Sequence, residues 1–172
     1  ARTLSISDNG IGMSRAELIE HLGTIARSGT LEFLNRTQDG GDAAPDLIGQ
    51  FGVGFYASFM VADEVEVVSR KAGEETATRW ISKGAGEYGL EDASRDTVGT
   101  TIRLHLKAVD GEAGIADFCD EWVLRQVIRK YSDFVAYPIR LTLLEAAKGE
   151  DGAAADAGAL PTRRTLDAPL NS

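Results

Sequence analysis

The spacing of apolar and polar positions predicts a strand, a turn and a helix near the start of the chain. Residues 3–7 alternate apolar and polar side chains and run into Asp-Asn-Gly at 8–10, which is typical of a strand that ends in a turn. Ser14 and Glu17 then have the spacing of a capping box, so we expect a helix that continues to about Leu22. The apolar face of this helix would carry Leu18, Ile19 and Leu22.

An alternating period returns in the second half of the chain and predicts a sheet. Residues 100–106 show it most clearly, and a turn through 72–74 would join two neighbouring strands. The inward side chains of 100–106 would be Ile102, Leu104 and Leu106. The other expected elements are strands at 64–70, 76–81 and 138–144 and helices at 55–60 and 117–131.

Two further segments have little periodicity. The many glycines and polar residues between Gly23 and Gly54 favour a mobile cover. The segment from Ala147 to Ser172 is rich in Gly, Ala and Asp, a composition typical of a linker or frayed tail. The length of 172 residues suits a single domain with one sizeable core.

Composition excludes several classes of function. Acidic residues outnumber basic ones, 27 to 18, and the formal charge of -9 disfavours attraction to the phosphates of nucleic acids. Apolar stretches are short, whereas a membrane-spanning helix needs roughly 20 apolar residues. The single cysteine, Cys119, is interpreted as a small core side chain in a reducing compartment, so we expect a cytoplasmic protein without nucleic-acid or membrane partners.

Two glycine clusters offer candidate chemistry. Asp8 stands at a strand end before Gly10 and Gly12, where its carboxylate could accept a hydrogen bond from a ligand amino group while the glycines let the backbone approach a flat ligand. An ordinary junction between strand and helix is the alternative explanation. Residues 49–55 hold three glycines before a helix, so successive N–H groups there could bind an anion, with a flexible hinge as the alternative.

A third element completes the candidate site. Thr100 lies where a strand begins, and its hydroxyl, together with the carboxylate and the glycine loop, could hold a purine and a polyphosphate. Threonine is also common in strands for structural reasons, so Thr100 alone does not distinguish a ligand contact from an ordinary strand residue. Arg27 could contact a phosphate or be a solvated helix residue.

These segments, in this order, resemble the ATP-binding domain shared by gyrase, the ninety-kilodalton heat-shock chaperones, sensor histidine kinases and MutL. The resemblance is closest to the heat-shock chaperones in their bacterial form, and it covers residues 1 to about 145. It is carried by DNGIGM at 8–13, HLGTIARSGT at 21–30, IGQFGVGFY at 48–56, GTTIRLHLK at 99–107 and KYSDF at 130–134.

The resemblance implies an α/β two-layer sandwich, with a mixed, mostly antiparallel sheet, helices on one face, and a mobile lid at about 21–54 that closes over nucleotide. Residues 1–145 would form the ATP-binding domain, and 146–172 would be a linker or tail toward a middle domain. The ligand would be ATP or ADP with Mg²⁺. The whole protein would be a homodimeric, ATP-hydrolysing, stress-response chaperone that assists the folding of unfolded client proteins.

The resemblance also implies roles for individual residues. Asp8 would accept from the adenine amino group, helped by Thr100. The base pocket would be lined by Gly12 and Met13, with His21 and Leu22 near the sugar and base and Arg27 near the phosphates. Phosphate would be bound by the amides of 50–55, among them Gln50, Gly52, Val53, Gly54 and Phe55.

One departure from the family bears on catalysis. The family carries its general-base Glu and its Mg²⁺-coordinating Asn upstream of the first glycine motif, whereas only seven residues precede Asp8 here. We therefore expect no catalytic residue and no metal ligand in this chain, which would lack the first strand and the catalytic helix. A binding-only fragment without hydrolysis is the alternative function. A histidine-kinase or topoisomerase relative is disfavoured by the segments at 21–30 and 48–56.

Overall fold

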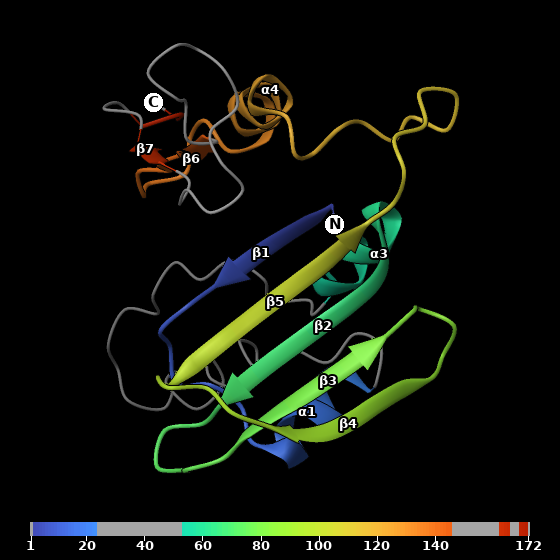
Figure 1. The fold of residues 1–172 in the computed structure, drawn as a ribbon, viewed down its shortest axis with the longest axis vertical. Coiled ribbons are helices and arrows are strands. Elements are labelled where there is room, and N and C mark those ends of the chain that lie inside the picture. The colour runs from blue at the N-terminus through green and yellow to red at the C-terminus, as the bar shows by residue number, and fades with distance from the viewer. Residues whose placement is uncertain (1, 24–52, 146–161, 166–168, 172) are drawn as a thin grey trace, which may run out of the picture. The chain divides into compact units, whose positions relative to one another are not determined.

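The computed structural model describes residues 2–23, 53–145, 162–165 and 169–171, which fall into two compact units, 1–115 and 116–172. The first unit is built on a five-stranded antiparallel sheet with the strand order β1-β5-β2-β3-β4 (Figure 1). Its strands are β1 (Thr3–Ser7), β2 (Ala62–Arg70), β3 (Ala77–Ser82), β4 (Tyr88–Ala93) and β5 (Gly99–Leu106).

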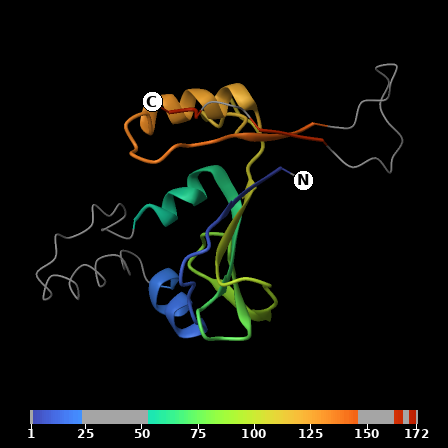
Figure 2. The same cartoon turned by 90° about the vertical axis from the view of Figure 1, so that its left-hand side faces the viewer.

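Helices cover one face of this sheet. Helix α1 (Arg15–Leu22) and the short helices η2 (Phe55–Ala57) and α3 (Ser58–Val61) lie on the same side of the strands (Figure 2). The expected two-layer α/β arrangement is therefore confirmed, and every described strand pair is antiparallel. Most of the expected lid, residues 24–52, lies outside the described residues. None of the described helices is long and apolar enough to span a membrane.

The core of the first unit forms on the covered face of the sheet. Val67 of β2 is fully buried and stands opposite Trp80 of β3 and Ile102 of β5. Leu104, next inward on β5, is also buried, which confirms the alternation expected there. From α1 only Leu18 is fully buried, whereas Ile19 is 41% exposed, so the apolar face of this helix is narrower than predicted.

Charged side chains cross-link the other face. Glu66 of β2 is only 8% exposed and accepts from Arg79 of β3 at 2.8 Å and from Arg103 of β5 at 3.0 Å. Arg79 also pairs with Glu91 of β4. Burial by itself raises the pKa of Glu66, but the hydrogen bond and charge of Arg79, with the charges of Arg103 and His105, lower it overall. Glu66 therefore stays ionised and joins β2 to β3 and β5, while Arg79 extends the network to β4.

A capping box anchors α1, as the sequence predicts. The Ser14 hydroxyl accepts from the Glu17 amide at 3.3 Å, and the Ser14 amide donates to the Glu17 carboxylate at 2.8 Å. Lys71, just after β2, donates to the same carboxylate at 2.5 Å. The hydrogen bonds from Lys71 and then Ser14 lower the pKa of Glu17 from 4.5 to about 2. One side chain thus both caps the helix and holds it to the sheet.

The second unit contains α4 (Glu121–Tyr131) and the antiparallel pair β6 (Thr142–Glu145) and β7 (Thr162–Thr165). Asp120 caps α4 by accepting from the Val123 amide at 3.0 Å. Asn171 is buried and accepts from the amide of Ile139 at 2.8 Å. Strand β7, Leu170 and Asn171 lie within the segment for which the sequence predicts a linker or tail, and the Thr-Arg-Arg-Thr of β7 has no apolar alternation that would signal a strand.

The interpretation of Cys119 as a core side chain was wrong, because its side chain is exposed. Its amide donates to the Asp117 carboxylate at 2.9 Å, which places Cys119 in the turn before α4. Strand β4 is not among the predicted elements, because its residues Tyr-Gly-Leu-Glu-Asp-Ala include a single glycine and two acids in place of regular alternation.

Substituting Glu17 tests the anchoring of α1. The lowered pKa means that the carboxylate stabilises the fold fully above about pH 4.5 and loses this effect as pH falls toward about 2. We expect Glu17→Gln to lower the free energy of unfolding by about 1 kcal/mol near neutral pH, a figure reduced for solvent screening because the pair is about one-third exposed.

Denaturant titrations near neutral pH and near pH 2.5 measure this difference, which should shrink on acidification. Glu75→Gln, at an exposed position after β2, serves as the control and should change little at either pH. An equal loss for Glu17→Gln at both pH values would contradict the anchoring role.

Candidate functional site

Asp8 is held in a fixed orientation directly after β1. Its amide donates to the carbonyl of Thr100 at 2.9 Å. Its carboxylate oxygen Oδ1 accepts from the amides of Gly10 at 2.9 Å and Thr100 at 3.2 Å. Arg95 donates to the Asp8 carbonyl at 3.0 Å. These contacts occupy Oδ1 and leave Oδ2, for which the described residues supply no donor, available to accept from a ligand.

A buried serine links Asp8's neighbours. The Ser69 hydroxyl lies 2.8 Å from the Thr100 hydroxyl. The Met13 amide donates to the Ser69 hydroxyl at 2.8 Å. Ser69 is 1% exposed. The structure therefore brings together three of the predicted site residues, Asp8, Met13 and Thr100. Ser69, which is not among the predicted site residues, links Met13 to Thr100. A signal was available, because alternation along β2 places Ser69 on the same face as Val65 and Val67.

Glycines at two positions let the site segments pack closely. Gly12 has φ +66°, and a Cβ there would lie 2.0 Å from the Arg70 carbonyl oxygen. Gly99 has φ +120°, and its Cβ would lie 2.3 Å from the Asp8 carbonyl oxygen. At Gly12 the predicted close approach is to a ligand, whereas the approach that the structure shows is to the backbone of the protein itself.

The remaining described candidates gather around the end of α1. Tyr56 donates to the Leu22 carbonyl at 3.3 Å, and burial raises the pKa of Tyr56. Phe55 packs edge-on against Trp80 at a centroid distance of 5.6 Å. His21 lies in the last turn of the same helix, and its Nδ1 is buried with no hydrogen-bond partner among the described residues. A cavity of about 230 Å³ opens here, lined by Leu22, Gly23, Tyr56, Phe59, Trp80, Ser82, Gly84, Gly86, Glu87 and Tyr88.

Part of the expected phosphate loop can be located. Val53 and Gly54 are exposed and precede η2, and the Tyr56 amide of η2 donates to the Val53 carbonyl at 3.2 Å. Arg27, Gln50 and Gly52 lie outside the described residues. Within the described part of the chain, no group of three or more His, Cys, Asp or Glu side chains could hold a metal ion, so Mg²⁺ coordination is assigned to no described residue.

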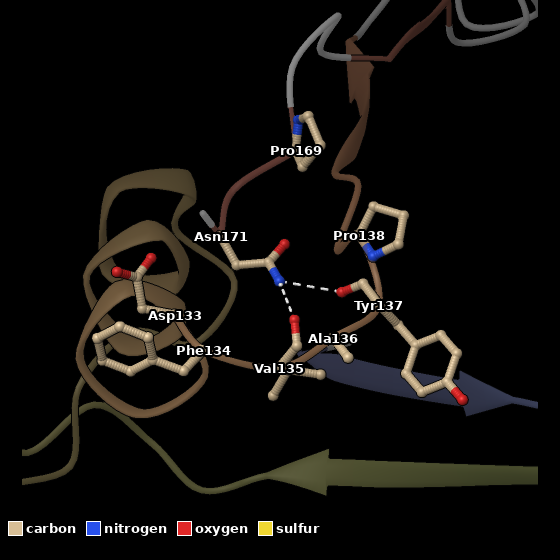
Figure 3. A pocket seen from close by; sticks show the side chains of 8 residues that line it. All are labelled: Asp133, Phe134, Val135, Ala136, Tyr137, Pro138, Pro169 and Asn171. Carbon is tan, nitrogen blue, oxygen red and sulfur yellow. Dashed lines mark hydrogen bonds between the residues drawn. The ribbon is translucent and has the colours of Figure 1, made fainter.

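A larger hollow, of about 480 Å³, lies in the second unit and has a different character. Asn171 donates to the carbonyls of Val135 and Tyr137 at 3.0 Å each, so these backbone acceptors are already paired (Figure 3). The rest of its lining is Asp133, Phe134, Ala136, Pro138 and Pro169. This lining holds no cation and none of the predicted nucleotide-binding residues, so it does not suit a polyphosphate.

A pair of glycine variants tests whether close packing fixes the first motif. Gly12→Ala should lower the free energy of unfolding by about 3 kcal/mol, because the new Cβ meets the Arg70 carbonyl. Gly73→Ala is the matched control, since Gly73 also has positive φ, +87°, but no atom lies within 4 Å of its Cβ position. The control should lose only about 1 kcal/mol. Equal losses in denaturant titrations would show that packing at Gly12 contributes nothing.

Comparison with known proteins identifies related sequences. Residues 1–102 match the family described as histidine kinase-, DNA gyrase B-, and HSP90-like ATPase. The chain is 49% identical over 177 residues to the chaperone protein HtpG of Frankia casuarinae, covering 100% of this chain and 27% of that protein. The chain is 50% identical over 154 residues to HtpG of Salinispora tropica, and the match covers 88% of this chain and 24% of that protein. It is 50% identical over 143 residues to HtpG of Mycobacterium tuberculosis, and the match covers 82% of this chain and 22% of that protein. The chain thus spans about a quarter of the length of these relatives.

Proposed function

The chain belongs to the family of histidine kinase-, DNA gyrase B- and HSP90-like ATPases, and from this premise we propose that it binds ATP and ADP at the end of the sheet where Asp8 meets Thr100. The observation that carries the proposal is the fixed Asp8 carboxylate. Oδ1 is held by the amides of Gly10 and Thr100, so Oδ2 is presented as an acceptor without rearrangement. The adenine amino group is the matching donor.

We propose that the neighbouring residues complete the base site. Thr100 lies beside Asp8 and supplies a hydroxyl, while Gly12 and Met13 line the pocket for the base. Met13 is held there through its amide, which donates to Ser69. Hydrogen bonds to an ionised acceptor are strong when the geometry is preorganised, which suits a site that must select one base.

The sugar and phosphates would extend toward the end of α1 and the second glycine cluster. His21 and Leu22 would lie near the sugar and base, and Arg27 near the phosphates. The phosphate-binding amides would be those of Gln50, Gly52, Val53, Gly54 and Phe55. A chain of formal charge -9 has no general positive field to offer, so backbone N–H groups and Mg²⁺, which neutralises phosphate charge when bound, would hold the polyanion.

For the whole protein we propose an ATP-dependent chaperone, in line with the names of the relatives. Residues 1–145 would be its ATP-binding domain, and 146–172 would lead toward a middle domain. Closure of the lid at 21–54 over nucleotide would couple ATP binding and hydrolysis to a change in a homodimer that assists unfolded client proteins. A cytoplasmic location and a stress-response role complete this proposal.

Replacing the Asp8 carboxylate tests the base site. In Asp8→Asn the amide can present an NH₂ group toward the adenine amino group, so two donors face each other. We expect affinity for ADP, measured by titration calorimetry, to fall about 100-fold, which corresponds to about 3 kcal/mol.

Asp96→Asn removes an exposed carboxylate from the loop before β5 and should bind ADP as the unsubstituted chain does. Unchanged affinity in Asp8→Asn would remove the basis for the proposed base site.

A further inference from the structure

We propose that Ser69 is a positioning residue that fixes the Thr100 hydroxyl as a hydrogen-bond donor toward the nucleotide base. The inference rests on the proposed function and adds a residue that neither the motifs nor the comparisons single out. Ser69 lies near the end of β2, directly opposite Thr100 on β5 and Thr78 on β3. Ser69 therefore lies between two neighbouring strands, buried next to Thr100 and not exposed at the candidate site.

The positions of the acceptors around Ser69 decide where its proton goes. The Met13 amide donates to Ser69 Oγ, so this oxygen is already an acceptor and has a single proton to give. Two acceptors lie near it, the Thr100 hydroxyl at 2.8 Å and the Gly99 carbonyl at 3.4 Å. Bonds between hydroxyl donors and oxygen acceptors have lengths of about 2.5–3.0 Å. Donation by Thr100 would leave the buried Ser69 proton only the 3.4 Å contact, so we assign the Ser69 proton to Thr100. Thr100 then accepts from Ser69.

That assignment determines what Thr100 can do. A hydroxyl that accepts through one lone pair keeps its own proton for another partner. The Thr100 amide donates to Asp8 Oδ1 at 3.2 Å, so the residue that carries this hydroxyl is hydrogen-bonded to the carboxylate that accepts from the ligand. The site consequently presents one acceptor and one donor side by side.

An adjacent acceptor and donor select a particular class of base. Adenine carries an amino donor flanked by ring-nitrogen acceptors, N1 on one edge and N7 on the other. Guanine and hypoxanthine carry a carbonyl at the position of that amino group, and it would face the Asp8 carboxylate. If Thr100 instead donated to Ser69, its proton would be unavailable to the base. Ser69 thereby contributes to recognition without touching the ligand.

The burial of Ser69 supports a role beyond packing. The residue is 1% exposed and follows Val65 and Val67 on the covered face of β2, where an apolar side chain would fill the space. A buried hydroxyl is costly unless it is hydrogen-bonded, and here its acceptor and donor capacity are both used. A comparable hydroxyl pair, Ser7 of β1 and Thr101 of β5 at 3.0 Å, is exposed on the opposite face of the sheet and takes no part in the proposed ligand contacts.

The test compares ADP with 1-deaza-ADP and 7-deaza-ADP, each of which lacks one ring-nitrogen acceptor. In the unsubstituted chain, we expect one of these analogues to bind about tenfold more weakly than ADP by titration calorimetry, because it lacks the acceptor for Thr100. In Ser69→Ala, ADP should also bind about tenfold more weakly, whereas that analogue should lose less than about twofold.

Five further variants isolate the contribution of the Ser69 hydroxyl. Ser69→Thr keeps the hydroxyl and should restore the preference for ADP over the analogue. Ser7→Ala removes the matched exposed pair and should bind all three ligands normally. Thr100→Val should repeat the pattern of Ser69→Ala, and combining the two should weaken ADP binding no further, because both changes remove one interaction. If Ser69→Ala is too unstable for titration, Ser69→Cys, with its weaker donor, gives the same comparison.

The outcomes separate this inference from the proposed function. An unsubstituted chain that fails to bind ADP would overturn both. Normal ADP affinity in Ser69→Ala, with loss of affinity in Asp8→Asn, would leave the nucleotide site in place and overturn the role of Ser69. An equal loss for ADP and for both analogues in Ser69→Ala would show a purely structural effect and would also overturn it.

Discussion

The hydrogen bond from the Thr100 amide to Asp8 Oδ1, 3.2 Å long, is the contact on which the candidate site depends. It joins the end of β1 to the start of β5, two segments separated by most of the first unit. The Asp8 amide returns a bond to the Thr100 carbonyl at 2.9 Å, and Gly99 provides the space for this approach. Because the strands are in register here, with Ser7 opposite Thr101, the sheet itself orients the carboxylate.

The candidate site is built from backbone groups and neutral hydroxyls around one carboxylate. Binding through backbone amides suits a chain with a formal charge of -9, because oriented amides can bind an anion locally without changing the net charge of the protein. The ionised side chains are used elsewhere. Glu66 and its two arginine partners join the strands on the face away from the helices, and Glu17 holds α1 to the sheet through Lys71. Charged pairs therefore stabilise the scaffold, whereas the candidate site combines the Asp8 carboxylate with backbone and hydroxyl dipoles.

Local sequence patterns predicted the elements that depend on local chemistry. The capping box of Ser14 and Glu17 and the alternation of β5 are both present, because a cap and a half-buried strand leave a clear spacing in the sequence. Ser69 was missed because its importance arises from strand register, which places it opposite Thr100. Strand β7 was missed because Thr-Arg-Arg-Thr owes its conformation to pairing with β6. The roles of the site residues toward nucleotide came from the family resemblance and remain predictions.

The central claim is that adenine nucleotides bind where Asp8 meets Thr100. Backbone amide chemical shifts of the isotope-labelled chain, recorded during titration with ADP, test it most directly. The account predicts saturable shifts that are largest at the amides of Gly10, Met13 and Thr100, with little change at Val135 and Tyr137 in the second unit. Saturable shifts confined to the second unit, or none at Gly10, Met13 and Thr100, would contradict it.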